Sequence, residues 1–203
     1  MYIPKHFLIE DEAFIEKMIV ENSFATLISF AEGEPMATHL PLQFDAINNV
    51  LYGHVARLNN QWKQLDGQKV LAIFHGPHAY ISPTWYETNK AVPTWNYVAV
   101  HVYGNCTLID DDEKTLHLLD ELVEAYEDIE SSYSMKAVDG SFMKNLSKGI
   151  VMFQIGITRI EAKAKLSQNH SEERKLGVIT QLEKSTGQQD QQIATLMKQY
   201  LEK

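Results

Sequence analysis

Short segments of alternating hydrophobic and polar residues, separated by turn residues, fill the first half of the chain and restrict it to a largely antiparallel β fold. Four of them have strand length: Phe24–Phe30, Pro35–Phe44, Val50–Leu58 and Lys69–His75. The gaps after the first two are of hairpin length and contain Gly, Asp and Asn. A longer candidate, Tyr97–Leu108, carries apolar side chains on both faces, so we expect it at the centre of the sheet.

Helical periodicity appears near the ends of the chain and in a few segments between the strands. We expect one helical turn and four helices: Asn59–Leu65, Asp11–Asn22, Asp139–Ser147, Ser171–Lys184 and Gln188–Glu202. Ile150–Leu166 is expected to form one or two strands, broken near Gly156. Because no Gly/Ser linker divides the 203 residues, the chain is predicted to be a single domain, residues 1–203. The predicted architecture is an antiparallel β-barrel with added helices, mainly β, and helices close the chain from about residue 171.

The negative charge of the chain is concentrated in one segment. Ten of the 27 acidic residues lie in Asp110–Glu130 with a single lysine, and the formal net charge of the whole chain is −9. The segment is predicted to be an amphipathic helix, capped by Asp110 with Glu113, whose acids face solvent rather than hold a cation. Because the sequence has no helix-turn-helix with a basic recognition helix, direct DNA binding is not expected.

A single cysteine, Cys106, limits the covalent chemistry of the chain. No internal disulfide and no paired-cysteine metal site can form, which suits a reducing cytoplasm. The longest uncharged run, Ala91–Ile109, is too polar to span a bilayer, and the N-terminal residues lack the apolar core of an export signal. We therefore expect a soluble cytoplasmic protein that does not enter a membrane.

Common nucleotide-binding and hydrolase motifs are missing from the sequence. It contains no GxGxxG, GxxxxGK[ST], HExxH or GxSxG, so Rossmann, P-loop, zincin and α/β-hydrolase functions lose their main support. His75 and His78 have HxxH spacing, but in an extended segment this spacing puts the two rings on opposite faces unless Gly76-Pro77 forms a turn. No nearby carboxylate completes a ligand set, so no metal site is predicted.

Arginine is scarce, and one of the three arginines, Arg57, lies in a predicted strand. Two interpretations are open. Arg57 can pair with a surface carboxylate at a sheet edge, or it can form an anion cradle with His54 and Asn59, because a guanidinium matches phosphate bidentately. A phosphate ester with an aromatic body would also need a flat, partly apolar slot. Two polar aromatic loops offer such a slot: Ser82 with Trp85 and Tyr86, and Thr94 with Trp95, Asn96 and Tyr97.

Five ordered motifs, spread over nearly the whole chain, resemble the PaiB family, whose members are described as FMN-binding negative transcriptional regulators. The motifs are His39-Leu-Pro-Leu42, Gly53-His-Val-Ala-Arg-Leu-Asn59 followed by Trp62, Gly76–Tyr86, Val92–Tyr97, and Lys165–Asn169 with Arg174. The resemblance implies an antiparallel split β-barrel of the FMN-binding type, similar to pyridoxamine-phosphate oxidase and small flavin reductases. It also implies a homodimer with FMN at the subunit interface. One departure is Asn60, where the family pattern has a proline.

The same resemblance implies which residues bind FMN. The phosphate is assigned to Arg57 with His54 and Asn59. One strand is expected beside the isoalloxazine ring and bonds its pyrimidine edge through main-chain groups: His39, Leu40 and Pro41. The remaining contacts come from the strand of Arg57, from the aromatic loops, which can act across the dimer, and from a segment near the C-terminus: Val55, Ala56, Ser82, Trp85, Trp95, Asn96, Gln168 and Asn169.

Three functions remain open at this point. In the first, FMN or its redox state regulates a dimer that represses protease synthesis and sporulation, either indirectly or as a flavin-dependent sensor. In the second, the same pocket belongs to an FMN-dependent oxidoreductase, of flavin reductase or oxidase type, that acts on a small molecule. The third is a haem-binding protein with a histidine as iron ligand. No residue is predicted as a catalytic acid or base.

Overall fold

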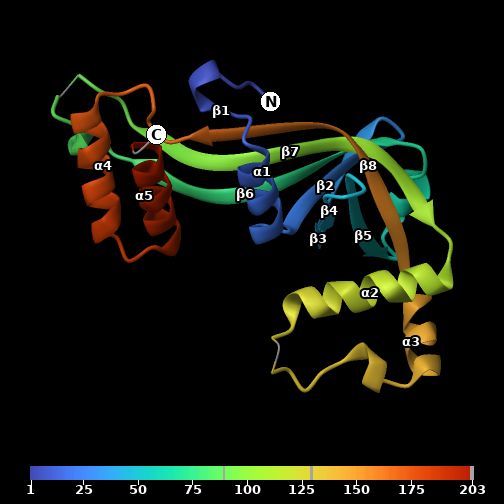
Figure 1. Ribbon diagram of the computed structural model, residues 1–203. Helices are drawn as coiled ribbons and strands as arrows, with labels where there is room; N and C mark the ends of the chain where they lie inside the picture. The colour runs from blue at the N-terminus through green and yellow to red at the C-terminus, as the bar shows by residue number, and fades with distance from the viewer. Residues whose placement is uncertain (89, 129, 202–203) are drawn as a thin grey trace. The chain divides into compact units, whose positions relative to one another are not determined.

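The computed structural model of the chain describes residues 1–88, 90–128 and 130–201 (Figure 1). Within these ranges the strands are β1 (Leu8–Ile9), β2 (Phe24–Ala31), β3 (Glu34–Pro41), β4 (Gln43–Asp45), β5 (Val50–Ala56), β6 (Lys69–Ile81), β7 (Thr94–Ile109) and β8 (Ile150–Lys165). The α-helices are α1 (Glu12–Glu21), α2 (Asp112–Tyr126), α3 (Gly140–Ser147), α4 (Glu172–Lys184) and α5 (Gln188–Leu201). Short 3-10 helices are η1 (Lys5–Phe7), η2 (Asn60–Gln64), η3 (Pro83–Trp85) and η4 (Met135–Ala137).

The strands form one sheet in the order β3-β2-β6-β7-β8-β5-β4, with β1 paired to β8. The pairs β1–β8, β2–β3, β2–β6, β4–β5 and β5–β8 are antiparallel, and the predicted short turns join two of them, β2–β3 and β4–β5. β2 and β3 form a hairpin in register from Phe24 opposite Pro41 to Ala31 opposite Glu34. Its turn residues Glu32 and Gly33 both have positive φ, 54° and 85°, which matches the twist of antiparallel strands.

The chain divides into two compact units. Unit 1 comprises Met1–Met18, Phe74–His101 and Glu161–Lys203, and unit 2 comprises Ile19–Ile73 and Val102–Ile160. The long strands β6, β7 and β8 contribute residues to both units.

Each unit has its own buried apolar side chains. In unit 1, α4 packs against α5 and buries Val178, Leu182, Ile193 and Met197. In unit 2, Leu27, Leu51 and Phe153 are fully buried among the sheet residues. Gly53 of β5 is required there, because a Cβ atom at this position would lie 2.6 Å from Cδ2 of Leu42.

Several predicted boundaries are wrong, each for a local physical reason. β6 continues to Ile81 instead of stopping at His75, because the glycine at position 76 lets the backbone approach β7: a Cβ on Gly76 would lie 3.1 Å from the carbonyl oxygen of Val98. The predicted strand Pro35–Phe44 is interrupted at Leu42, whose N–H donates to the carbonyl of Ser23.

Two further boundaries differ by less. The acidic helix is capped by Asp111 rather than Asp110, with the carboxylate of Asp111 accepting from the N–H of Lys114. β8 runs as one strand through Gly156, so the alternative of two strands is wrong. Over the described residues, no helix is both long and apolar enough to cross a bilayer.

Cys106 of β7 is completely buried in unit 2. Its main-chain N–H donates to the carbonyl of Gln68, and its own carbonyl accepts from Gly67. Burial raises the pKa of the Cys106 thiol to about 12, and the charge of Asp66 adds to this shift. The thiol is therefore protonated and shielded at neutral pH.

Candidate functional site

Arg57 follows the last residue of β5, and its guanidinium is held by main-chain carbonyls. Nε donates to the carbonyl of Lys148 at 2.7 Å, and Nη2 donates to the carbonyl of Ile150 at 2.8 Å. The guanidinium also lies over the ring of Trp62, 5.8 Å from its centroid. These contacts fix the fork while leaving Nη1 and one hydrogen of Nη2 unused among the described residues. Arg57 is therefore a preorganised and largely uncompensated cation at the surface.

Asn59 builds the turn that follows Arg57. Its side-chain oxygen accepts from the N–H of Gln61 at 3.0 Å, and its amide donates to the hydroxyl of Thr38 at 2.9 Å. Gln61 is buried and continues the network to the hydroxyl of Ser29. Because these bonds join η2 to β2 and β3, Asn59 positions the Arg57 segment and uses its own polar groups in doing so.

His54 faces α2 and lies opposite Met152 in the register of β5 with β8. It lines a small cavity with Leu118 and Leu122 of α2 and with Met152. The cavity has a volume of ≈ 10 Å³, about the size that a single water needs. Burial lowers the pKa of His54 below its usual value, so the imidazole is neutral at pH 7. Its neighbours on β5 differ, since Val55 points into the core and Ala56 is exposed.

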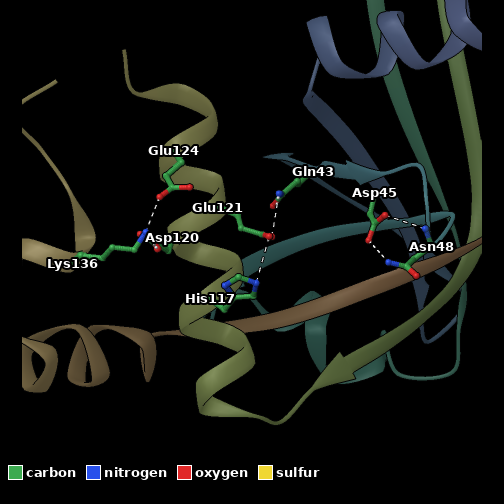
Figure 2. A network of polar contacts seen from close by, with 8 residues as sticks. All are labelled: Gln43, Asp45, Asn48, His117, Asp120, Glu121, Glu124 and Lys136. Carbon is green, nitrogen blue, oxygen red and sulfur yellow. Dashed lines mark hydrogen bonds and ion pairs between the residues drawn. The ribbon is translucent and has the colours of Figure 1, made fainter. Parts of the chain in front are cut away.

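The acidic face of α2 fastens the helix to its surroundings (Figure 2). Lys136 of η4 pairs with Glu124 at 2.9 Å and with Asp120 at 3.3 Å, and the carboxylate hydrogen bonds raise the pKa of Lys136, that of Glu124 most. On the other side, Glu121 accepts a bond from Gln43 of β4. Figure 2 also draws the ion pair of Glu121 with His117, and Asp45 with Asn48 in the turn after β4. These contacts connect α2, which lies against His54, to η4 and to β4.

The residues predicted beside the flavin ring lie on β3, a strand at one end of the sheet order. A terminal strand leaves main-chain N–H and C=O groups on its outer side without a strand partner. His39 and Leu40 have N–H groups, whereas Pro41 offers only its carbonyl. The side chain of His39 is exposed, contacts the Thr26 hydroxyl at 3.0 Å, and stacks near Phe24. In unit 2 the end strand of the sheet order and the exposed Arg57 are the candidates for holding the pyrimidine edge and the phosphate of FMN.

The aromatic loops belong to unit 1. Ser82 caps η3 by accepting from the N–H of Thr84, and this turn carries Trp85. Trp95 is 52% exposed and lies near Tyr80 and His78, with ring centroids 5.8 and 6.0 Å away. This exposed aromatic surface can stack on a planar ligand.

Two other predicted contacts shape the turn after β8. Asn96 is completely buried, and its amide donates to the hydroxyl of Ser167 at 3.0 Å. Ser167 has a left-handed backbone with φ 64°, which that bond helps to hold. Gln168 bonds to the N–H of Leu166 and to the carbonyl of Ala164. Asn96 and Gln168 therefore act as positioning residues, and Asn169 lines a cavity.

The structure thus brings the predicted residues into two groups. In unit 2 are His39, Leu40, Pro41, His54, Val55, Ala56, Arg57 and Asn59. In unit 1 are Ser82, Trp85, Trp95, Asn96, Gln168 and Asn169. That both groups contact one flavin stays a prediction.

Lys165 and Arg174 were part of a family motif, but neither they nor His170 were predicted as site residues, although all three line the cavity of Asn169. Part of the signal was available, because Arg174 is one of only three arginines in the chain, although it lies in a predicted helix and not in a strand. The gap between β8 and α4 also gathers Ser, Gln, Asn and His, the composition of a polar loop.

Comparison with known proteins adds a family and a fold. Residues 1–159 match a family model described as "Putative FMN-binding domain". The chain is 39% identical over 208 residues to "Protease synthase and sporulation protein PAI 2" of Bacillus subtilis, and the match covers 100% of this chain and 99% of that protein.

Two solved structures share the fold at low sequence identity. The flavocytochrome Anf3 of Azotobacter vinelandii superposes with a TM-score of 0.63 at 14% identity, over 81% of this chain and 72% of the other. An FAD and heme binding protein of Mycobacterium smegmatis gives a TM-score of 0.61 at 13% identity, over 82% and 77%. The predicted fold, an antiparallel split barrel with added helices, is confirmed.

Proposed function

The chain belongs to the PaiB family of FMN-binding proteins, and from that membership we propose that it is an FMN-dependent regulator that lowers the expression of genes for protease synthesis and sporulation. The observation that carries the regulatory part is the match to PAI 2, which extends over essentially the full length of both chains. FMN is its cofactor. We place it in the cytoplasm, where flavin and target genes are available, and treat both units as one FMN-binding domain.

The proposed binding mode starts from the unit 2 residues described above. Arg57 binds the phosphate through its remaining N–H groups, while the carbonyls of Lys148 and Ile150 keep the guanidinium from turning away. Main-chain groups of His39 and Leu40 hold the pyrimidine edge. That Trp85 and Trp95 of unit 1 shield the ring of the same flavin stays a prediction of the family resemblance. When bound, FMN supplies a redox centre whose state can be sensed.

We propose that a second copy of the chain covers the outer face of β2. Phe24 and Phe30 are 67% and 54% exposed on this face. Phe30 borders a cavity of ≈ 380 Å³ that is also lined by Ile28, Leu71 and Tyr103. Apolar side chains gathered in this way on one sheet face are typical of a protein interface. A homodimer in which each subunit offers the same surface satisfies this requirement.

The regulation is proposed to be indirect. The chain carries a net charge of −9, and the exposed acids of α2 would repel the phosphates of a duplex. A protein partner, or a metabolite that responds to the flavin, transmits the signal instead.

A visible spectrum during FMN titration, read together with the mass in solution, tests the proposal. We expect a bound flavin, a mass of two chains, and no bleaching by NADH. Rapid bleaching by NADH with return of the colour in air would contradict the regulatory proposal and favour an oxidoreductase. A Soret band would favour a haem-binding protein.

The dimer surface has its own test. Phe30→Glu should yield monomers in light scattering, because it buries a charge in the interface, whereas Ile47→Glu, a matched change at a residue 95% exposed in the turn between β4 and β5, should leave dimers intact. Dimers in both variants would contradict this surface.

A further inference from the structure

Unit 1 contains a cavity of ≈ 340 Å³, and Asn169 is the one residue assigned to the flavin among its described lining residues. Its walls come from the segment after η3, from the start of β7, and from the turn between β8 and α4. The polar residues that matter are Tyr86, Lys165, His170 and Arg174, with Lys90 and Thr94 at the same cavity. The volume is that of a site for a small organic molecule.

Lys165 supplies a positive charge to this cavity with no carboxylate beside it in the described part of the chain. Its ammonium group donates to the hydroxyl of Thr94 and, at 2.7 Å, to the carbonyl of Trp95. An ammonium group has three N–H donors, so one remains for a ligand. Burial lowers the pKa of Lys165, and the nearby charge of Lys163 lowers it further, which means that the ammonium lacks the compensation that an anion would give.

Arg174 and His170 form a second set of donors. Arg174 is stacked over the ring of Tyr86 at 4.7 Å and is clamped by Glu87, with Nη2 to Oε1 at 2.6 Å and Nε to Oε2 at 3.2 Å. Its Nη1 lies 3.3 Å from Nδ1 of His170. Because a guanidinium only donates, Nδ1 accepts and the proton of a neutral imidazole is on Nε2. Burial lowers the pKa of His170, as do Arg174 and Lys165, which keeps that neutral form at pH 7.

The hydroxyl of Tyr86 is an unsatisfied polar group at this cavity. Its oxygen is buried and has no hydrogen-bond partner among the described residues. Buried hydroxyl groups nearly always have a partner, because an unmade bond there costs free energy. The segment is firmly seated, since Gly177 of α4 approaches so closely that a Cβ would lie 2.8 Å from the carbonyl of Trp85. Because the hydroxyl oxygen itself has almost no accessible surface, it meets a ligand oxygen only after the Tyr86 ring turns toward the cavity that it lines.

We propose that this cavity binds a small ligand carrying an oxyanion, a phosphate monoester or a carboxylate, at a site separate from that of the FMN phosphate. Lys165 pairs with the oxyanion, and Tyr86 donates its hydroxyl hydrogen to it. The site is separate from the phosphate position assigned to Arg57: Lys165, His170 and Arg174 lie in unit 1, whereas Arg57 lies in unit 2. It gives the proposed regulator a place for a metabolite signal.

Calorimetric titration of the full-length protein tests the site, with inorganic phosphate and succinate as the two probes. Lys165→Gln should weaken the better probe by about tenfold or more, as expected for a lost charged hydrogen bond, and Tyr86→Phe should weaken it by a few-fold. Lys184→Gln, an exposed lysine at the end of α4, is the matched control and should bind like the wild type. The better probe tells whether phosphate esters or carboxylates are the natural class.

Three outcomes would overturn the proposal: neither probe binds, Lys165→Gln and Tyr86→Phe both bind like the wild type, or the probe competes with FMN. Competition would place the phosphate of FMN itself in this cavity. Titration of FMN into Lys165→Gln separates this inference from the proposed function. We expect this variant to bind FMN with the affinity of the wild type. That result is expected whether or not the wild-type protein binds phosphate or succinate.

Discussion

Arg57 in unit 2 and Arg174 in unit 1 are both fixed by hydrogen bonds and both lie over an aromatic ring. Only the charge of Arg174 is compensated by a carboxylate. Arg57 contacts the carbonyls of Lys148 and Ile150, which carry no net charge, so its positive charge stays available. Arg174 forms a fork with the carboxylate of Glu87, its side chain is only 18% exposed, and its charge is compensated. The partner of an arginine, more than its burial, decides whether it can receive an anion.

Replacing each of these two arginines by alanine is expected to give the largest difference between them. Arg57→Ala should weaken FMN binding by more than tenfold, because a hydrogen bond to a charged group contributes about 1.5–3 kcal/mol. Arg174→Ala should leave FMN affinity within a factor of about two, because Arg174 is assigned no hydrogen bond to the flavin. Flavin fluorescence during titration measures both. Equal losses in the two variants would show that the compensated arginine also serves the flavin.

Glycine in a helix offers a second contrast between the units. Gly177→Ala should destabilise the protein by about 1–3 kcal/mol, because the new methyl group meets the carbonyl of Trp85. Gly140→Ala, in α3 of unit 2, has nothing within 4 Å and should be neutral or stabilising by up to about 1 kcal/mol. Urea denaturation followed by circular dichroism gives both values. A loss of stability in Gly140→Ala as large as in Gly177→Ala would mean that crowding is not the cause.

Histidine titration sharpens the comparison through pH. Burial lowers the pKa of His54 below the usual histidine value of 6.5, so the unfolded chain binds protons before the folded chain does as the pH falls. Stability is therefore complete above pH 6.5 and falls as the pH drops below it toward the lowered pKa. His54→Gln should reduce this fall in urea midpoints.

His170→Gln should do the same in unit 1, but there the cations Arg174 and Lys165 add to burial. High salt should consequently reduce the part of the stability loss at low pH that is due to His170 and leave the part due to His54 unchanged. Salt screens charges but does not reverse burial. An equal response to salt at the two sites would contradict these assigned causes.

The smallest change in stability is expected from a difference between the 3-10 helices η2 and η3. η3 begins with Pro83 after its cap Ser82, whereas η2 begins with Asn60 after its cap Asn59. Asn59 has φ −77° and ψ 111°, a conformation compatible with a following proline. Asn60→Pro should therefore raise the free energy of unfolding by about 0.4–1 kcal/mol. Thermal denaturation measures it, and a lower melting temperature would show that the turn is strained.

Much of the fold could be predicted from sequence, because alternation and turn residues are local signals. The helix predicted over Ser171–Lys184 and the helical turn predicted over Asn59–Leu65 both form, as α4 and η2. The continuation of β6 through Gly76 and Pro77 could not be predicted, since it depends on the approach of Val98 from another strand.

The candidate site was only partly within reach of sequence. Arg57 could be selected because a scarce cation in a strand needs a reason, but its carbonyl partners come from residues far along the chain. Asn96 resembled a ligand contact, and its burial against Ser167 is a tertiary fact. The charge around Lys165 arises when three separate segments meet, which no spacing in the sequence reveals.

The shielded thiol of Cys106 allows the opening of β7 to be timed in the unmodified protein. At a pKa of about 12 and with no exposed surface, it reacts with an alkylating reagent only while β7 opens. Because the chain has no other cysteine, the rate of mass increase counts those openings without any engineered label.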